Sequence, residues 1–230
     1  MIYIGIDDTD TFDTPGTNQL ARALVERLAS AYECVSIVRH QLLFDPRVPY
    51  TTKNGSASIV FKPRGNFSIE DLLGELRTTM RAWFKEGSDP GLCVAQEIPK
   101  EISEFGLRCQ RDVVHQDEAR KLAADSGIHL EGLGGTEGGV IGALAAVGLI
   151  VTGNDGRVVQ LGTWPDDLSN YQPISVLQGR GVVVQELNSG QWLTEGTVDV
   201  GKHLRPNLRK GKVVQFVVPQ GSAWQAVRLT

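Results

Sequence analysis

The sequence predicts an α/β fold with a mixed sheet, followed by a small all-β module. In the first two thirds of the chain, short apolar runs rich in β-branched residues alternate with segments that carry apolar residues at helical spacing. In the last third, strand-like runs follow one another between Gly, Asn and Lys turns. We therefore expect an α+β domain at residues 1–165 and a β-rich module at residues 166–230.

The first two elements flank a cluster of acidic residues. The apolar run Ile2–Ile6 is typical of a buried strand. A helix is expected from Thr17, which we interpret as its N-cap, because apolar residues recur behind it at helical spacing. These residues are Leu20, Ala21, Leu24, Val25 and Leu28.

The later elements follow from the same two periodicities and from turn residues. In the first domain we expect, in order, strands at Cys34–Arg39 and Ser56–Phe61, a helix from its cap Ser68 to about Phe84, a turn at Gly87–Gly91, a helix from Gln116 to near Gly127, a glycine-rich loop at residues 132–139 and an apolar helix at residues 140–148. In the module we expect strands at Gly181–Leu187, Gln191–Val198, Val213–Pro219 and Trp224–Leu229.

Composition places the chain among folded globular proteins. Its 230 residues are 41% apolar and 22% charged, which is ordinary usage. The formal net charge of −4 argues against general coating of nucleic acid, although a local basic patch remains compatible with it. The concentrated basic segment at residues 203–212 is either a solvated turn or such a patch.

Cysteine usage and hydropathy bear on location. Cys34, Cys93 and Cys109 are widely spaced and form no zinc-binding motif, so we expect buried thiols in a reducing compartment. No apolar run approaches the ~18 residues of a membrane span, and the N-terminus has no signal-peptide pattern. We expect a cytoplasmic protein that does not associate with a membrane.

The most informative feature is the acidic cluster Asp7, Asp8, Asp10 and Asp13, directly behind the first strand. Carboxylates packed this closely repel one another unless a cation neutralises them. Oxygen ligands without His or Cys suit Mg²⁺. Asp7, Asp8 and Asp10 are therefore candidate metal ligands, and the alternative is a solvated Asp-rich turn.

Other segments have the residue types that bind phosphates. Backbone N–H groups at the helix start near Gly16 and Thr17 suit an anion. The backbone of the glycine-rich loop at residues 132–139 could also approach a phosphate closely, although the loop lacks the G-K-[ST] ending of a Walker A loop. The alternative is a flexible surface loop. Candidate cations for the phosphates are Arg39, His40, Arg47 and Lys53. Together these features predict a site for ATP and Mg²⁺.

Five short blocks also stand in a definite order along residues 1–150. They are Gly5-Ile6-Asp7-Asp8-Thr9-Asp10-Thr11, Gly16-Thr17 at a helix start, Pro49–Gly55, Asp89-Pro90-Gly91 and Gly139–Gly148. In sequence and order they resemble the kinase domain of the archaeal tRNA-isoleucine 2-agmatinylcytidine synthetases. The resemblance does not extend past about Gly162.

The resemblance implies an enzyme that uses ATP and Mg²⁺ to phosphorylate the C2 oxygen of a wobble cytidine, which agmatine then displaces. It also implies that the kinase domain phosphorylates one of its own threonines. The implied partners are ATP, tRNA or a partner RNA-binding subunit, and agmatine or another small amine. By motif position, Asp7, Asp8 and Asp10 would bind metal and ATP phosphates, and Thr17 would be the phosphorylated threonine. The implied nucleotide-binding residues are Gly16, Lys53, Asn54, Gly138 and Gly139.

This chain departs from the family at several positions. The family has a lysine where this sequence has Thr51, and a basic residue where it has Gly138. The family continues into an oligonucleotide-binding fold and a Cys-rich zinc ribbon that holds tRNA, and the cysteines of this chain do not supply the ribbon.

Three functions are therefore weighed. The first is an ATP- and Mg²⁺-dependent, kinase-like enzyme of tRNA processing, of ligase or transferase type, that phosphorylates an oxygen of RNA or of a smaller acceptor. The second is a haloacid-dehalogenase-type phosphatase, because Asp8-Thr9-Asp10 imitates its acidic loop and Asp166-Asp167 its distal acidic pair. The third is a non-catalytic module that binds nucleotide or RNA.

Overall fold

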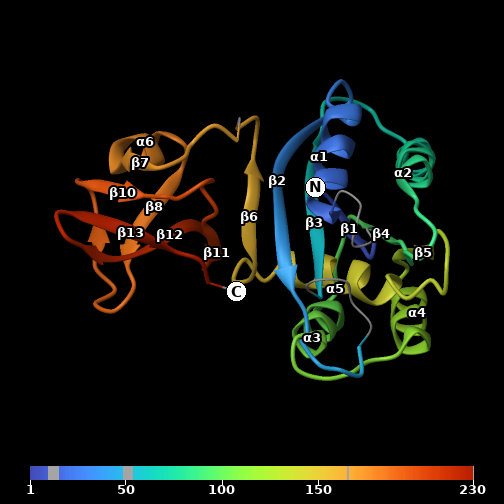
Figure 1. The fold of residues 1–230 in the computed structure, drawn as a ribbon. Helices are drawn as coiled ribbons and strands as arrows, with labels where there is room; N and C mark the ends of the chain where they lie inside the picture. Colours follow the sequence, from blue (N-terminus) through green and yellow to red (C-terminus); the bar gives the residue numbers. More distant parts are fainter. Residues whose placement is uncertain (10–15, 49–53, 165, 230) are drawn as a thin grey trace.

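The computed structural model describes residues 1–9, 16–48, 54–164 and 166–229. Figure 1 shows two halves, with strand β6 standing between them. One half is a sheet covered by helices, and the other is β-rich. The predicted fold class, a mixed α/β fold followed by a β-rich region, is confirmed.

The helical half contains the elements on which the functional site is built. They are β1 (Ile2–Asp7), α1 (Thr17–Leu28), β2 (Tyr32–Gln41), β3 (Gly55–Pro63), α2 (Ile69–Trp83), β4 (Gly91–Ala95), α3 (Lys100–Cys109), α4 (Gln116–Asp125), β5 (His129–Gly132), α5 (Val140–Ile150) and β6 (Arg157–Leu161). Sequence analysis missed β4, α3, β5 and β6. The three strands have four or five residues each, too few to show a period.

The β-rich half contains strands at three of the four predicted positions, and the strand expected at Gln191–Val198 is instead two short strands. It also contains further short strands and one short helix that the sequence did not predict. Its elements are β7 (Tyr171–Pro173), α6 (Ile174–Gly179), β8 (Val182–Glu186), β9 (Trp192–Leu193), β10 (Thr197–Asp199), β11 (Asn207–Arg209), β12 (Lys212–Gln220) and β13 (Ala223–Val227). Nothing in the described parts of either half is a helix long and apolar enough to cross a membrane.

The sheet runs through both halves in the order β5-β4-β1-β3-β2-β6-β11-β12-β13-β10-β7. Pairs among β1 to β6 are antiparallel, and the parallel pairs β8–β12 and β10–β13 lie in the β-rich half. Strands β1 and β2 both pair antiparallel with β3, so they run in the same direction and end at the same edge. Asp7, the last residue of β1, therefore lies at the edge where β3 begins.

Two apolar layers sandwich the helical half of the sheet. Helices α1 and α2 pack on one face over Ile4, Ile6 and Ile59 of the central strands. Helices α3, α4 and α5 form the layer on the other face. Helix α5 is apolar on all sides and almost wholly buried, as expected for a helix enclosed by neighbours.

Helix α5 lies backbone to backbone on the sheet. A Cβ atom added to Gly5 of β1 would lie 1.9 Å from the Ala143 carbonyl oxygen. A Cβ added to Gly91 of β4 would lie 2.1 Å from the carbonyl oxygen of Gly139. Only glycine permits an approach this close. The contact places the N-terminal end of α5 beside the last residue of β1.

A buried polar cluster joins β2, β3 and the segment before β6. His40 is fully buried, with Nδ1 2.6 Å from Asp155 Oδ2 and Nε2 2.9 Å from Ser58 Oγ. Gln110 donates to the other Asp155 oxygen at 2.9 Å. Burial alone would raise the pKa of Asp155, but the hydrogen bonds from His40 and Gln110 outweigh it and hold that pKa below its ordinary value.

Asp155→Asn is expected to destabilise the protein by about 2 kcal/mol at neutral pH, because the hydrogen bonds that His40 and Gln110 donate to a largely buried charged group are weakened. Since the folded pKa of Asp155 is depressed, its contribution is present above the unfolded pKa near 4 and is lost as pH falls through the folded value. Urea unfolding of both proteins at pH 7 and pH 3 should show the difference shrinking at low pH. A difference that is unchanged at pH 3 would contradict this account.

Candidate functional site

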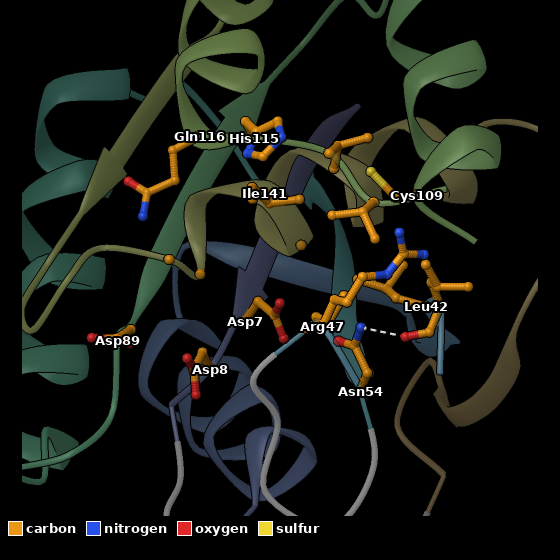
Figure 2. A pocket seen from close by; sticks show the side chains of 18 of the residues that line it. Asp7, Asp8, Leu42, Arg47, Asn54, Asp89, Cys109, His115, Gln116 and Ile141 are labelled. Carbon is orange, nitrogen blue, oxygen red and sulfur yellow. Dashed lines mark hydrogen bonds between the residues drawn. The ribbon is translucent and has the colours of Figure 1, made fainter. Parts of the chain in front are cut away.

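A cavity of about 340 Å³ opens at the edge of the sheet where β1 ends. Asp7 and Asp8 are among the residues that line it (Figure 2). Asp8 has a φ of 49°, in the left-handed region that few residues other than glycine adopt. Such strain is concentrated at functional sites.

The structure brings together several of the residues predicted from sequence. Asp7, Asp8, Asn54, Gly138 and Gly139 come from distant segments and all line the cavity. Gly16 and Thr17 are not among the lining residues. The predicted ligand Asp10 and the predicted cation Lys53 lie outside the described residues.

Asp7 rests against the first turn of α5. A Cβ added to Gly142 would lie 1.7 Å from Asp7 Oδ2, so the carboxylate occupies the space that a side chain would take. The N-terminal end of a helix has a partial positive charge that favours an anion. Helix α5 therefore both positions the Asp7 carboxylate and offsets part of its charge.

Asp89, which sequence analysis did not name as a site residue, is a further carboxylate in the cavity wall (Figure 2). It lies in the loop that precedes β4. Its only sequence signal was its place in the block Asp89-Pro90-Gly91.

The glycine-rich loop wraps around Asp89. The backbone N–H of Thr136 donates to the Asp89 carboxylate, and the N–H of Gly139 donates to the Asp89 carbonyl oxygen at 2.9 Å. Gly135 has a φ of +61°, and a Cβ there would lie 1.9 Å from Asp89 Oδ1. The loop is thus held by a carboxylate.

Gly138 is less constrained than Gly135. A Cβ at Gly138 would come no closer than 3.5 Å to a neighbouring atom, so a side chain fits there.

Of the four cations proposed for the phosphates, Arg47 lines the cavity. Its guanidinium donates to both carboxylate oxygens of Asp45, at 2.8 Å each, and the Arg47 hydrogen bond holds the pKa of Asp45 at about 2. The prediction for His40 is wrong, because its ring is fully buried in the cluster with Asp155. Arg39 lies beside Gly55, behind the cavity wall.

Part of the cavity lining is apolar. It is formed by Leu42, Leu43, Val113, Ile141 and the thiol of Cys109. Burial raises the pKa of Cys109 to about 12, so this thiol is neutral and forms part of an apolar wall. Cys34, Cys93 and Cys109 are free and buried, as predicted. A lining that combines apolar side chains with a few polar groups is typical of small-molecule sites.

The carboxylates of Asp7 and Asp8 suit Mg²⁺, which keeps part of its water, better than they suit a metal ion that protein ligands surround on all sides. Across the described parts of the chain, no three His, Cys, Asp or Glu side chains are grouped to hold a metal ion. Mg²⁺ is commonly bound through one or two carboxylates together with substrate phosphates and water. Asp7 and Asp8 provide two such carboxylates in one cavity.

Thr17 is not the helix cap predicted from sequence. Gly16 is the N-cap of α1, and Thr17 is the first helical residue, with 9% of its surface exposed. Its hydroxyl accepts a hydrogen bond from the Thr9 hydroxyl at 3.2 Å. The helix has no side-chain cap hydrogen bond, and the Gln19 N–H donates to the Gly16 carbonyl at 2.8 Å.

The acidic pair Asp166-Asp167, which the phosphatase hypothesis needs, does not lie at the cavity that contains Asp7 and Asp8. Asp166 accepts hydrogen bonds from Arg205 and Arg22, and Asp167 accepts one from Arg180 at 3.0 Å. Neither aspartate lines the cavity that contains Asp8. This arrangement does not support the phosphatase hypothesis, which needs both acidic groups at one site.

Comparison with known proteins supports the resemblance. The tRNA(Ile2) 2-agmatinylcytidine synthetase TiaS of Pyrococcus horikoshii is 30% identical over 157 residues, which are 64% of this chain and 35% of the relative. TiaS of Archaeoglobus fulgidus is 30% identical over 150 residues, with the same shares covered. No family model matches the sequence.

Solved structures of tRNA-modifying enzymes are also similar to this chain in fold. The crystal structure of the TiaS–tRNA(Ile2)–ATP complex matches with a TM-score of 0.55 and 25% identity, over 64% of this chain and 36% of that one. The crystal structure of a tRNA fluorescent labeling enzyme matches with a TM-score of 0.56 and 25% identity, over 64% and 35%.

The chain spans about a third of the length of these relatives. The predicted resemblance is nevertheless confirmed, because it is found in sequence and in fold over the same share of this chain. This protein therefore contains a domain that resembles part of the tRNA(Ile2) 2-agmatinylcytidine synthetases.

Proposed function

We propose that this protein binds Mg–ATP in the cavity at the end of β1 and activates an oxygen of RNA, or of a smaller acceptor, by phosphorylating it. The observation that supports this most is the combination of two carboxylates, a helix N-terminus and an apolar wall in one cavity. The second support is the similarity of the domain to an enzyme whose structure was solved with tRNA(Ile2) and ATP.

The cavity suggests how the nucleotide would lie. The apolar side, with Leu42 and Ile141, suits the flat base. The triphosphate would then point toward Asp7, Asp8 and the start of α5, where a helix end favours negative charge. Mg²⁺ held by Asp7 and Asp8 would neutralise charge on the phosphate oxygens.

The proposed reaction has two steps. In the first, the acceptor oxygen attacks the γ-phosphorus of ATP, and ADP leaves with the electrons of the broken P–O bond. In the second, the nitrogen of an amine such as agmatine attacks the carbon that bears the phosphorylated oxygen, phosphate leaves, and the amine loses a proton. The protein aligns the reactants, since phosphoryl transfer depends mainly on positioning and charge stabilisation.

Thr17 has a separate proposed role as the protein's own phosphorylation site. Its hydroxyl lies at the start of α1, within hydrogen-bonding distance of Thr9 and close in sequence to Asp8. A phosphate on this hydroxyl would be favoured by the partial positive charge of the helix N-terminus.

Incubation with γ-labelled ATP and Mg²⁺ tests the proposal. We expect calorimetry to show saturable ATP binding that EDTA abolishes, and mass spectrometry to find the label on Thr17. Thr17→Val, which has a similar volume but no hydroxyl, should bind ATP without becoming labelled. Absence of Mg-dependent ATP binding at millimolar ATP would overturn the proposed function. Binding with an unlabelled Thr17 would overturn the role of Thr17 alone.

A further inference from the structure

Arg157, the first residue of strand β6, is a partly buried cation. Within residues 1–9, 16–48, 54–164 and 166–229, no group forms a hydrogen bond or ion pair with its guanidinium. The next residue, Val158, packs beside Ile150 of α5 on one face of the sheet. Successive side chains of a strand point to opposite faces, so Arg157 projects from the other face, which α1 and α2 cover.

Helix α1 reaches strand β6 through Arg22. This side chain donates to the Val159 carbonyl oxygen at 2.7 Å and to Gln160 Oε1 at 3.3 Å. Asn18 lies four residues before Arg22 and is therefore on the same side of the helix. Helix α1 ends shortly before β2 begins, and β6 runs antiparallel to β2, so α1 and β6 start at the same end of the sheet. Asn18 is thus level with Arg157.

Asn18 has an unsatisfied atom of its own. Its Oδ1 atom is buried, and no donor from the described ranges bonds to it. Buried acceptors in folded proteins almost always have a donor, so an orphan of this kind calls for an explanation. We name the place where Asn18 and Arg157 meet the α1–β6 seam. Among the described residues, it combines a cation without an acceptor and an acceptor without a donor.

The surroundings of Arg157 are positively charged. Arg39 of β2 is directly opposite Arg157 in the pairing of the two strands. Burial lowers the pKa of Arg157, and the charges of Arg39, Arg228 and Arg205 lower it further. Asp166 is held by Arg205, with hydrogen bonds of 2.8 and 2.7 Å. Like charges opposite each other on neighbouring strands are destabilising, so a bound anion would relieve repulsion here.

Hydrogen phosphate matches both unsatisfied groups of the α1–β6 seam. Its double negative charge and its acceptor oxygens suit a guanidinium, which binds phosphate through two parallel hydrogen bonds. At neutral pH it also keeps one O–H group, which can donate to the Asn18 oxygen. Sulfate has the same charge and nearly the same shape but no O–H group.

We propose that the α1–β6 seam is a binding site for inorganic phosphate, separate from the cavity at the end of β1. The Arg157 guanidinium binds the charge of the anion, and the Asn18 oxygen accepts its O–H. The cavity lies on the other face of the sheet, where Cys109 and Gly142 of the α3–α5 layer line it. The inference goes beyond the proposed function and does not depend on it.

Calorimetric titration of the full chain with sodium phosphate, at constant ionic strength and without nucleotide, tests the site. We expect saturable binding of one phosphate per chain. Arg157→Gln should bind phosphate at least about tenfold more weakly, because charge-assisted hydrogen bonds are lost. The control Arg27→Gln removes the same charge from the last turn of α1, where Arg27 pairs with Glu75, and should leave phosphate binding unchanged.

The phosphate O–H group allows a second test. The wild type should bind phosphate at least about tenfold more tightly than sulfate, because a site with a buried acceptor rejects an analogue that lacks the donor. Asn18→Ala removes the acceptor, so the preference for phosphate should disappear while sulfate binding stays the same. An unchanged preference in Asn18→Ala would overturn the assignment of this site to phosphate.

Stability and nucleotide binding separate the site from its alternatives. Without phosphate, Arg157→Gln should be at least as stable to urea as the wild type, because repulsion between like charges is relieved. Saturating Mg–ATP should leave phosphate binding unchanged. Displacement of phosphate by Mg–ATP would place the anion in the cavity and overturn the inference, as would equal phosphate binding by Arg157→Gln and the wild type. A wild-type protein that binds phosphate at the seam but no ATP would overturn the proposed function alone.

Discussion

Asp8→Asn is expected to lower ATP turnover by about a hundredfold or more, which corresponds to about 2.7 kcal/mol or more of activation free energy. The substitution is nearly isosteric but removes the negative charge that would hold Mg²⁺ on the phosphates. Losses of this size follow removal of a single group that stabilises transition-state charge. Phosphate release or ADP formation, measured with saturating RNA acceptor, is the readout.

The matched control is Asp125→Asn. It removes the same charge from an exposed position at the end of α4, where the side chain pairs with Lys121. An exposed pair of this kind contributes little to stability, so turnover and unfolding should change little. A wild-type protein that binds Mg–ATP but has no turnover to lose would support the non-catalytic module. Full turnover in Asp8→Asn would exclude Asp8 from the chemistry.

Gly142→Ala is expected to lower turnover at least tenfold and to destabilise the protein by about 1 to 3 kcal/mol, the usual range for overpacking. The added Cβ would lie 1.7 Å from Asp7 Oδ2, so the Asp7 carboxylate must rotate away or α5 must shift. Either movement disrupts the carboxylate that faces the cavity. Turnover and urea unfolding measured on the same preparation test both parts.

Gly74→Ala provides the comparison, because Gly74 lies inside α2 and no neighbouring atom would come within 4 Å of its added Cβ. An alanine inside a helix is favoured over glycine by about 0.5 to 1 kcal/mol. This variant should therefore be more stable and equally active. If Gly142→Ala behaves in the same way, the inferred contact between α5 and Asp7 is wrong.

Sequence predicted best what depends on local pattern. Helices α1, α2 and α5 and strands β1 to β3 have clear periodicity or sharp boundaries, and the structure contains them. The acidic residues at and after the end of β1 were identified because several charges of one sign are unusual where a buried strand ends. The domain division at residues 165 and 166 stays a prediction, and so do the roles of the site residues.

Sequence predicted least where distant segments meet. Strand pairing is non-local, so the antiparallel order that places β3 beside β1 cannot be read from periodicity. The cavity wall joins Leu42, Asp89, Val113 and Ile141 from four separate segments, and each is an ordinary residue in its own sequence context. The pairing of Arg39 with Arg157 likewise emerges only when β2 and β6 are adjacent.

The backbone contact between α5 and β1 has a consequence for how such a protein changes over generations. Gly5 of β1 and Gly91 of β4 are constrained by backbone atoms of Ala143, Gly139 and Val140, so a descendant that lost the proposed chemistry would still retain them. Its aspartates, freed from chemistry, would drift. A shared glycine pattern among distant homologues would therefore reflect ancestry of the scaffold, whereas retention of the Asp7-Asp8 pair would track the proposed nucleotide chemistry.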